Sequence, residues 1–182
     1  MNQDCIITYS KVKFSPLCAR KEEIEIADIA HALSLMCRAN GHIKHFYSVA
    51  QHSLNCLQEA KARKLSGKVQ LACLLHDASE AYLSDITRPV KRSLPQYREY
   101  EAVLQSLIYS KFGLEDLTEE DNEAVCSIDD GVLFEELLYL MDEEIFDRRP
   151  GLLSLPDLDL REFSAVEQEF LQEFKTLTSA GI

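Results

Sequence analysis

The chain has no long apolar run, and basic residues are scarce in it. No stretch approaches the roughly 20 apolar residues of a membrane helix, and no apolar segment with a cleavage site stands near the N-terminus. Lysine and arginine number 19 against 31 aspartates and glutamates, a formal net charge of −12. Because nucleic-acid backbones and anionic membranes attract basic surfaces, we predict a cytoplasmic protein that binds neither. A small phosphorylated ligand is compatible with this charge, since it needs only a local basic pocket.

Closely paired cysteines are also missing, which argues against a zinc-knuckle protein. Four of the cysteines lie inside apolar helical stretches, so we interpret the set as reduced core residues of a cytosolic protein rather than as disulfide partners. The set comprises Cys5, Cys18, Cys37, Cys56, Cys73 and Cys126.

Length and patterning predict one domain over residues 1–182, because the chain has ordinary hydrophobic content and neither an internal repeat nor a low-complexity segment. Two short extended stretches, near Ile6–Tyr9 and Ile24–Ile26, favour a small β-hairpin within residues 1–26. The spacing of apolar residues over 27–182 is helical. The predicted fold class is therefore all-α: a single compact helical domain with a short N-terminal hairpin.

Capping residues and glycines divide the helical region. Ser48 and Gln51 have the spacing of a capping box, which predicts a helix from there to about Lys64. Ser66 is expected to cap the following helix. The first helix, before these two, is expected to close at Gly41.

The C-terminal half is read from the same signals. The expected elements are an ordered loop over 84–94, a helix over 96–112 stopped by Gly113, a long acidic helix capped by Thr118, a surface loop over 148–159, and a last helix that Ser164 and Glu167 cap and that ends near Leu177.

The dipeptide His76-Asp77 is the most informative feature of the chain. It follows the apolar run 71–75, and a helix that buries this run has no packing use for adjacent polar groups. Imidazole and carboxylate offer two types of metal ligand from one short stretch of backbone. Another histidine, His52, lies upstream, and Asp129-Asp130 lies downstream, each on a predicted helix.

Helix phase distinguishes the two downstream aspartates. Asp129 shares one helix face, at four-residue steps, with Val125, Leu133 and Leu137. It is therefore expected to point into the bundle, whereas Asp130 is turned roughly 100° away. We favour Asp129 as the functional residue and keep Asp130 as the alternative.

The order His52, His76-Asp77, Asp129 resembles the HD superfamily of metal-dependent phosphohydrolases, and most closely its branch related to bacterial 5′-deoxynucleotidases. The similarity covers most of the chain, through segments 7–10, 28–34, 37–42, 46–53 and 74–86. It implies a metal-dependent phosphomonoesterase that acts on a small phosphoester, with a ribo- or deoxyribonucleoside 5′-monophosphate as the first candidate. The alternatives are a phosphodiesterase for cyclic nucleotides or other small molecules, and a non-catalytic nucleotide-binding protein.

The resemblance assigns one divalent ion to His52, His76, Asp77 and Asp129. Two neutral imidazoles and two carboxylates would leave such an ion formally neutral, with positions open for water and a phosphate oxygen. Manganese, cobalt, iron, nickel, zinc and magnesium all stay open as its identity. A single ion is expected, and only His31, His42 and His45 are left as histidines for a second one.

Five further residues receive roles from the resemblance. Glu80, four residues after His76 on the same expected helix face, or Asp85 carries the proton, and the choice between them stays open. Substrate binding falls to Arg38, His42 and Lys91, and the forked guanidinium of Arg38 suits phosphate. Arg38 and His42 are expected at the end of the first helix, where the helix dipole also favours a cation.

Two departures from the deoxynucleotidase pattern bear on specificity. The related enzymes carry a tryptophan after the pocket arginine, whereas this chain has none and Ala39 follows Arg38. Arg88, which we interpret as a solvated side chain, separates Thr87 from Pro89. Strict selection of a deoxyribose substrate is therefore not expected. A homodimer is implied only by the resemblance.

Overall fold

The N-terminal hairpin is tighter than the sequence indicates. In the computed structural model, β1 (Ile6–Ile7) pairs antiparallel with β2 (Lys13–Phe14). The predicted hairpin is confirmed, but its second strand at Ile24–Ile26 is wrong. A short connection closes at a lower entropic cost than a long one, and Ile24 is instead fully buried in the core.

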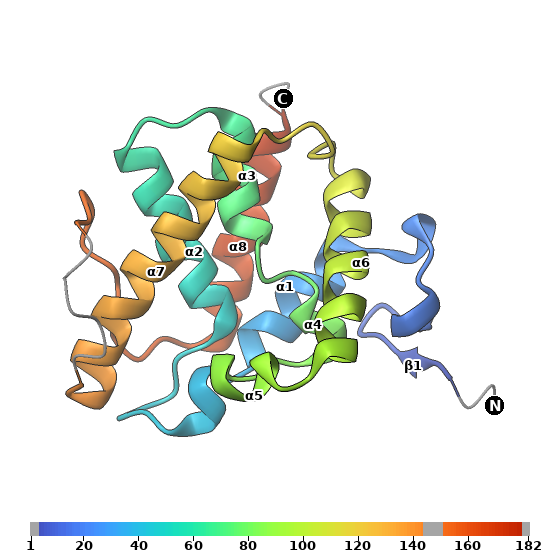
Figure 1. Cartoon of the computed structure of the whole chain (residues 1–182), viewed down its shortest axis with the longest axis horizontal. Helices are drawn as coiled ribbons and strands as arrows, with labels where there is room; N and C mark the ends of the chain where they lie inside the picture. Colours follow the sequence, from blue (N-terminus) through green and yellow to red (C-terminus); the bar gives the residue numbers. More distant parts are fainter. Residues whose placement is uncertain (1–3, 144–150, 180–182) are drawn as a thin grey trace.

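The structure describes residues 4–143 and 151–179, and this part of the chain is mostly helical, which confirms the all-α prediction (Figure 1). The helices α2 and α3 pack against each other and against both α7 and α8. Helix α1 packs against α2 and α8, and α6 lies at the side next to α5. The bounds are α1 Ile26–Leu35, α2 Val49–Ala62, α3 Gly67–Leu75, α4 Glu80–Leu83, α5 Arg88–Arg92, α6 Pro95–Lys111, α7 Glu119–Met141 and α8 Phe163–Ser179.

Predicted caps begin the central helices. The Ser48 hydroxyl accepts from the backbone N–H of Gln51 at the start of α2. The Ser66 hydroxyl accepts from the backbone N–H of Val69 at the start of α3. Thr118 forms a complete capping box at the start of α7. The box at Ser48 is only half formed, because the Gln51 side chain donates to the carbonyls of Asp157 and Asp159. It thereby holds the segment before α8 against α2.

The predicted end of the first helix and the predicted loop over 84–94 are wrong. The first helix ends at Leu35 rather than Gly41, because Met36 and Cys37 are extended and Cys37 forms an antiparallel bridge with Ser48. The expected loop over 84–94 contains α5, whose Pro89 lies in the first turn, where a missing N–H costs the helix nothing.

The C-terminal predictions are confirmed in part. The last helix starts at Phe163, so Ser164 lies inside it, and the Glu167 carboxylate pairs with His31 rather than completing a cap. Of the expected surface loop over 148–159, residues 148–150 lie outside the described residues, and the rest is irregular.

Most buried apolar side chains form one cluster shared by α1, α2, α3, α7 and α8. All six cysteines are free thiols, but only Cys56 and Cys73 are buried, so the prediction that the whole set lies in the core is wrong. Cys18 and Cys126 are exposed. Within the described residues, no helix combines the length and hydrophobicity needed to cross a bilayer.

A buried carboxylate anchors the irregular segment before α8. Glu59 of α2 is fully buried and accepts from the backbone N–H groups of Leu153 and Ser154, from the Ser154 hydroxyl and from Arg63. Burial opposes its charge, but the hydrogen bonds from Ser154, Leu153 and Arg63 prevail and lower the pKa of Glu59.

We expect Glu59→Gln to lower the free energy of unfolding at pH 7 by about 1–3 kcal/mol, because charged hydrogen bonds to buried donors are lost. The lowered pKa means that this stability is present above the ordinary glutamate value of 4.5 and is lost as the pH falls through the folded-state pKa. Urea denaturation at pH 7 and at pH values well below 4.5 measures both effects. The exposed Glu115→Gln is the control, and an equal loss in both variants would contradict the anchoring role.

Candidate metal centre

The four predicted metal ligands come together from three parts of the fold. His52 lies in α2, His76 and Asp77 directly follow α3, and Asp129 lies in α7. His52 Nε2 is 3.2 Å from His76 Nε2 and 3.1 Å from Asp129 Oδ1. His76 Nε2 is 3.3 Å from Asp77 Oδ2. The packing of α2, α3 and α7 therefore gathers residues that are far apart in the sequence.

These separations match the spacing of donors around one ion. Ligand atoms about 2.0–2.2 Å from a zinc-like ion are roughly 3.0–3.6 Å from one another. Two further pairs are somewhat wider, with His52 Nε2 at 3.8 Å from Asp77 Oδ2 and His76 Nε2 at 3.9 Å from Asp129 Oδ1. The two imidazoles and two carboxylates therefore lie close enough to share one cation.

Hydrogen bonds on the far side of both imidazole rings fix which nitrogen faces the centre. His52 Nδ1 lies 2.6 Å from Glu136 Oε1, and His76 Nδ1 lies 2.8 Å from the Cys73 carbonyl oxygen. A carboxylate and a carbonyl only accept, so each Nδ1 carries a proton and donates it. When both rings are neutral, their Nε2 lone pairs face each other at 3.2 Å. Such a pair needs a proton or a metal ion between them.

The electrostatics of the centre favour a cation. Burial lowers the pKa of His76, but the neighbouring Asp77 and Asp129 carboxylates outweigh it and raise that pKa to about 9. Burial likewise opposes the charge of both aspartates, yet the facing histidines lower the pKa of each carboxyl below its usual value. Both carboxylates are therefore ionised at neutral pH and available to a metal.

The structure separates Asp129 from Asp130 as helix phase predicts. Asp129 faces His52, whereas Asp130 is largely exposed and accepts from Arg88 at 2.6 Å. The same guanidinium donates to Asp129 Oδ2 at 2.7 Å. The Arg88 side chain is 45% exposed, as a solvated residue would be, but it also lines the cavity and bridges both aspartates.

Cys56 is a donor that the sequence interpretation left in the core. With His52 and His76 it forms a group whose ligand atoms all lie within 4.8 Å of one another and that could hold a metal ion. The signal was present in the sequence, because Cys56 follows His52 by four residues and shares its helix face.

Glu136 is the second missed residue. Its carboxylate is 5% exposed and accepts from His52, from the Tyr47 hydroxyl at 2.8 Å and from Arg38 Nε at 3.2 Å. Burial raises its pKa, but the charge of Arg38 and the contact with His52 prevail and lower it. The sequence held one signal for it, because Glu136 follows Asp129 by seven residues and therefore shares its helix face.

A cavity of about 600 Å³ opens next to the metal centre. Asp77 and Asp129 line it together with the predicted catalytic and substrate residues and with a set of apolar side chains. The polar set comprises Arg38, His42, Glu80, Asp85 and Lys91, and the apolar set comprises Ile43, Leu133, Leu137, Leu140 and Met141.

Glu80 reaches the cavity from a position that differs from the predicted one. The helix does not continue from His76, because α3 ends at Leu75 and a turn leads to α4, which begins at Glu80. The side chain is still buried, with Oε1 accepting from Lys91 at 3.2 Å and Oε2 without a hydrogen-bond partner in the described part of the chain. Burial, with the charges of Asp77 and Asp85, raises the pKa of Glu80 well above its usual value.

Arg38 also differs from its predicted setting. It lies on the 3-10 segment Arg38–Gly41, in which Ala39 and Asn40 adopt left-handed backbone angles, rather than at the end of α1. Its charge is held by side chains and not by a helix dipole, since it donates to Asp77 Oδ2 and to Glu136. Ala39, where the related enzymes have tryptophan, lines the cavity.

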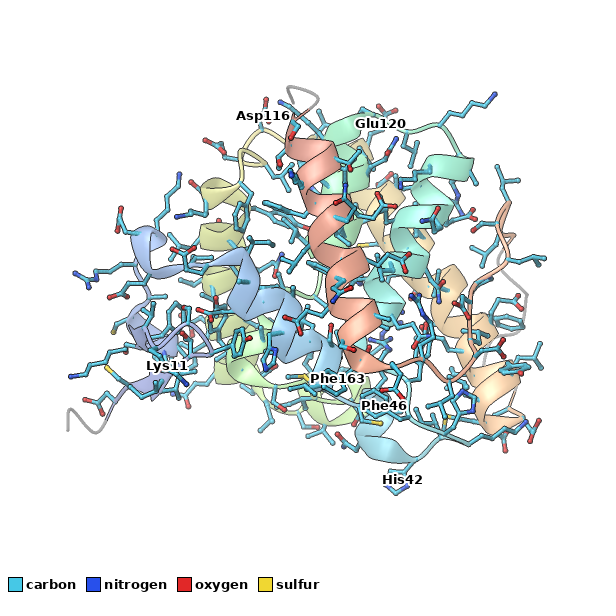
Figure 2. All side chains as sticks on the ribbon, turned by 180° about the vertical axis from the view of Figure 1, so that it is seen from behind. Lys11, His42, Phe46, Asp116, Glu120 and Phe163 are labelled. Carbon is cyan, nitrogen blue, oxygen red and sulfur yellow. The ribbon has the colours of Figure 1, made fainter. Side chains whose placement is uncertain are left out.

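The remaining candidate residues lie farther from the metal centre or at the edge of the cavity. His42 is exposed at the edge of the molecule, although it lines the cavity mouth (Figure 2). Asp85 lines the cavity, and burial raises its pKa. His31 stacks on Tyr9, and His45 Nε2 contacts the Leu158 carbonyl, so the described structure does not gather the spare histidines around a second ion.

Comparison with known proteins adds relatives without a stated activity. No family model matches the chain. It is 42% identical over 109 residues to the uncharacterized protein YfdR of Escherichia coli, covering 60% of this chain and 58% of that protein. It is also 42% identical over 98 residues to an uncharacterized protein of Rhodobacter capsulatus, covering 50% of each. The chain thus spans only 50–58% of the length of these relatives.

We expect Glu136→Gln to loosen the centre, because an amide oxygen replaces a charged acceptor that serves three donors. The free energy of unfolding should fall by about 1–3 kcal/mol, and the Nδ1–H form of His52 should lose its dominance. Urea denaturation and nitrogen NMR of the histidine rings measure the two effects. Tyr47→Phe, which removes one donor and keeps the carboxylate, should change the His52 signals less, and equal changes would contradict the central role of Glu136.

Proposed function

We propose that this protein is a metal-dependent phosphohydrolase of the HD superfamily that acts on a small phosphomonoester, with a nucleoside 5′-monophosphate as the first candidate. The observation that carries the proposal is the approach of His52 Nε2 and His76 Nε2 to 3.2 Å, beside two ionised aspartates that line a cavity. Two unprotonated imidazole nitrogens are both acceptors, so at this distance they repel each other unless a proton or a metal ion lies between them.

The donor set suits a divalent ion held by His52, His76, Asp77 and Asp129. Such an ion, when bound, would neutralise phosphate charge and lower the pKa of a coordinated water. The roles of the outer residues follow from their contacts. Glu136 and the Cys73 carbonyl keep the histidine nitrogens available, and Asp77 is oriented further by Arg38.

Cationic side chains beside the centre suit a phosphate group. Arg38 lines the cavity, donating one guanidinium hydrogen bond to Glu136 and another to Asp77. Lys91 lies between Glu80 and Glu101, at 3.2 and 2.6 Å. In a protein of net charge −12, these two residues bring positive charge to the place where the phosphate would bind.

Glu80 is favoured over Asp85 as the residue that carries the proton. One of its carboxylate oxygens is buried without a partner, and its pKa is raised, as suits an acid or base that works near neutral pH. Asp85 is more accessible and would orient the leaving group or a water. The apolar side chains that also line the cavity offer a surface for a base or another organic group.

A non-catalytic nucleotide-binding protein is the second candidate. One observation favours it: both aspartates already pair with arginines, Asp77 with Arg38 and Asp129 with Arg88. These ion pairs would compete with a metal. A cyclic nucleotide or another phosphodiester is a third candidate substrate for the same chemistry.

Metal-stripped protein should release phosphate from ribo- and deoxyribonucleoside 5′-monophosphates only after Mn²⁺, Co²⁺, Zn²⁺ or Mg²⁺ is added. In Asp77→Ala the release should fall to background, because one ligand and the partner of Arg38 are lost together. A colorimetric phosphate assay measures both. Metal binding without phosphate release from any monophosphate would favour a cyclic nucleotide as the substrate. If cyclic nucleotides are not hydrolysed either, the non-catalytic nucleotide-binding protein would be favoured.

We expect Glu80→Gln to lower kcat by about 10²–10⁴-fold, the usual contribution of a positioned acid or base. Asp85→Asn should cost less. Glu101→Gln is the matched control, because it also removes a partner of Lys91 but does not line the cavity. Steady-state kinetics with the best monophosphate decides, and a larger loss in Asp85→Asn than in Glu80→Gln would reverse the two roles.

A further inference from the structure

Cys56 directs a sulfur atom at the candidate metal centre from the protein interior. It lies on α2 one helical turn after His52 and is 1% exposed. Its Sγ is 3.5 Å from His52 Nε2, the atom that also faces His76 and Asp129. Asp77 and Asp129 line the cavity, whereas Cys56 does not. The centre therefore has carboxylates on its open side and a thiol on its closed side.

Two of the three separations among the interior donors suit coordination of one ion, and the third, between Cys56 and His76, lies within 4.8 Å. With zinc–sulfur bonds of about 2.3 Å and zinc–nitrogen bonds of about 2.0–2.1 Å, tetrahedral ligands are roughly 3.4–3.6 Å apart. The sulfur–nitrogen distance to His52 is 3.5 Å and the nitrogen–nitrogen distance to His76 is 3.2 Å. A histidine and a second ligand four residues apart on a helix present their donors on one face.

A buried free cysteine is more often a small apolar filler than a ligand. Cys73 provides the comparison within this chain, because it is equally buried and its side chain is not part of the donor group. Filling the core accounts for the burial of both cysteines. It does not account for the contact between Cys56 Sγ and His52 Nε2, a nitrogen already committed to the centre.

We propose that Cys56 binds the metal as a thiolate together with His52 and His76, and that the centre therefore selects thiophilic ions such as zinc or cobalt over magnesium and manganese. Asp77 or Asp129 would complete the coordination from the cavity side. On binding, the S–H bond of Cys56 breaks, a sulfur–metal bond forms and the proton passes to solvent. This inference rests on the metal-binding part of the proposed function and not on phosphate release.

Metal-stripped full-length protein loaded with Co²⁺ tests the proposal, because a cobalt–thiolate bond gives a charge-transfer absorption band in the near ultraviolet. The band should be present in the wild type and in Cys73→Ser, which keeps the main-chain carbonyl that holds His76. It should disappear in Cys56→Ser while cobalt still binds. The same variant should lower the ratio of zinc to magnesium affinity by about tenfold or more.

X-ray absorption of the zinc-loaded wild type needs no variant and should find a sulfur neighbour at roughly 2.3 Å. Zinc or cobalt bound by nitrogen and oxygen alone would overturn the role of Cys56 and leave the phosphohydrolase proposal standing. Absence of any metal binding would overturn both. A sulfur ligand in a protein that releases no phosphate would support the role of Cys56 and contradict only the proposed activity.

Discussion

The contact between the buried His52 ring and the Glu136 carboxylate is the interaction on which the rest of the site depends. It joins α2 to α7 at 2.6 Å and fixes the proton on the outer nitrogen of the ring. The inner nitrogen is thereby aimed at His76, Asp129 and Cys56. Arg38 and Tyr47 compensate the buried charge of Glu136 from the other side. An isolated carboxylate at this depth would be costly, so these contacts are stabilised or lost together.

Charge is distributed unevenly between the surface and the cavity. The chain is strongly acidic as a whole, yet Arg38, Arg88 and Lys91 all line one cavity and each is paired with acidic side chains. Pairing keeps these cations ordered, and a phosphate group would compete with carboxylates for them. The same pairing restrains Asp77 and Asp129, so a metal and an anionic ligand are expected to assist each other's binding.

Sequence patterns were reliable wherever the physical cause is local. Apolar spacing and the hydroxyls of Ser48, Ser66 and Thr118 mark the starts of helices, because an N-cap satisfies donors within its own first turn. Patterns failed where a distant partner intervenes. The bridge from Cys37 to Ser48 ends α1 early, and His31 takes the Glu167 carboxylate that the predicted cap required. Neither partner is visible from local spacing.

The sequence by itself determined the all-α class, the long acidic helix and the choice of Asp129 over Asp130, since each follows from periodicity along one helix. It also singled out His52, His76, Asp77, Glu80, Arg38 and Lys91 as site residues. Only the tertiary structure decided which groups surround them. Glu136 and Cys56 share helix faces with apolar neighbours and look like ordinary interior residues until α2, α3 and α7 are packed. Their contacts join segments up to 98 residues apart, and such contacts exist only once the helices have assembled.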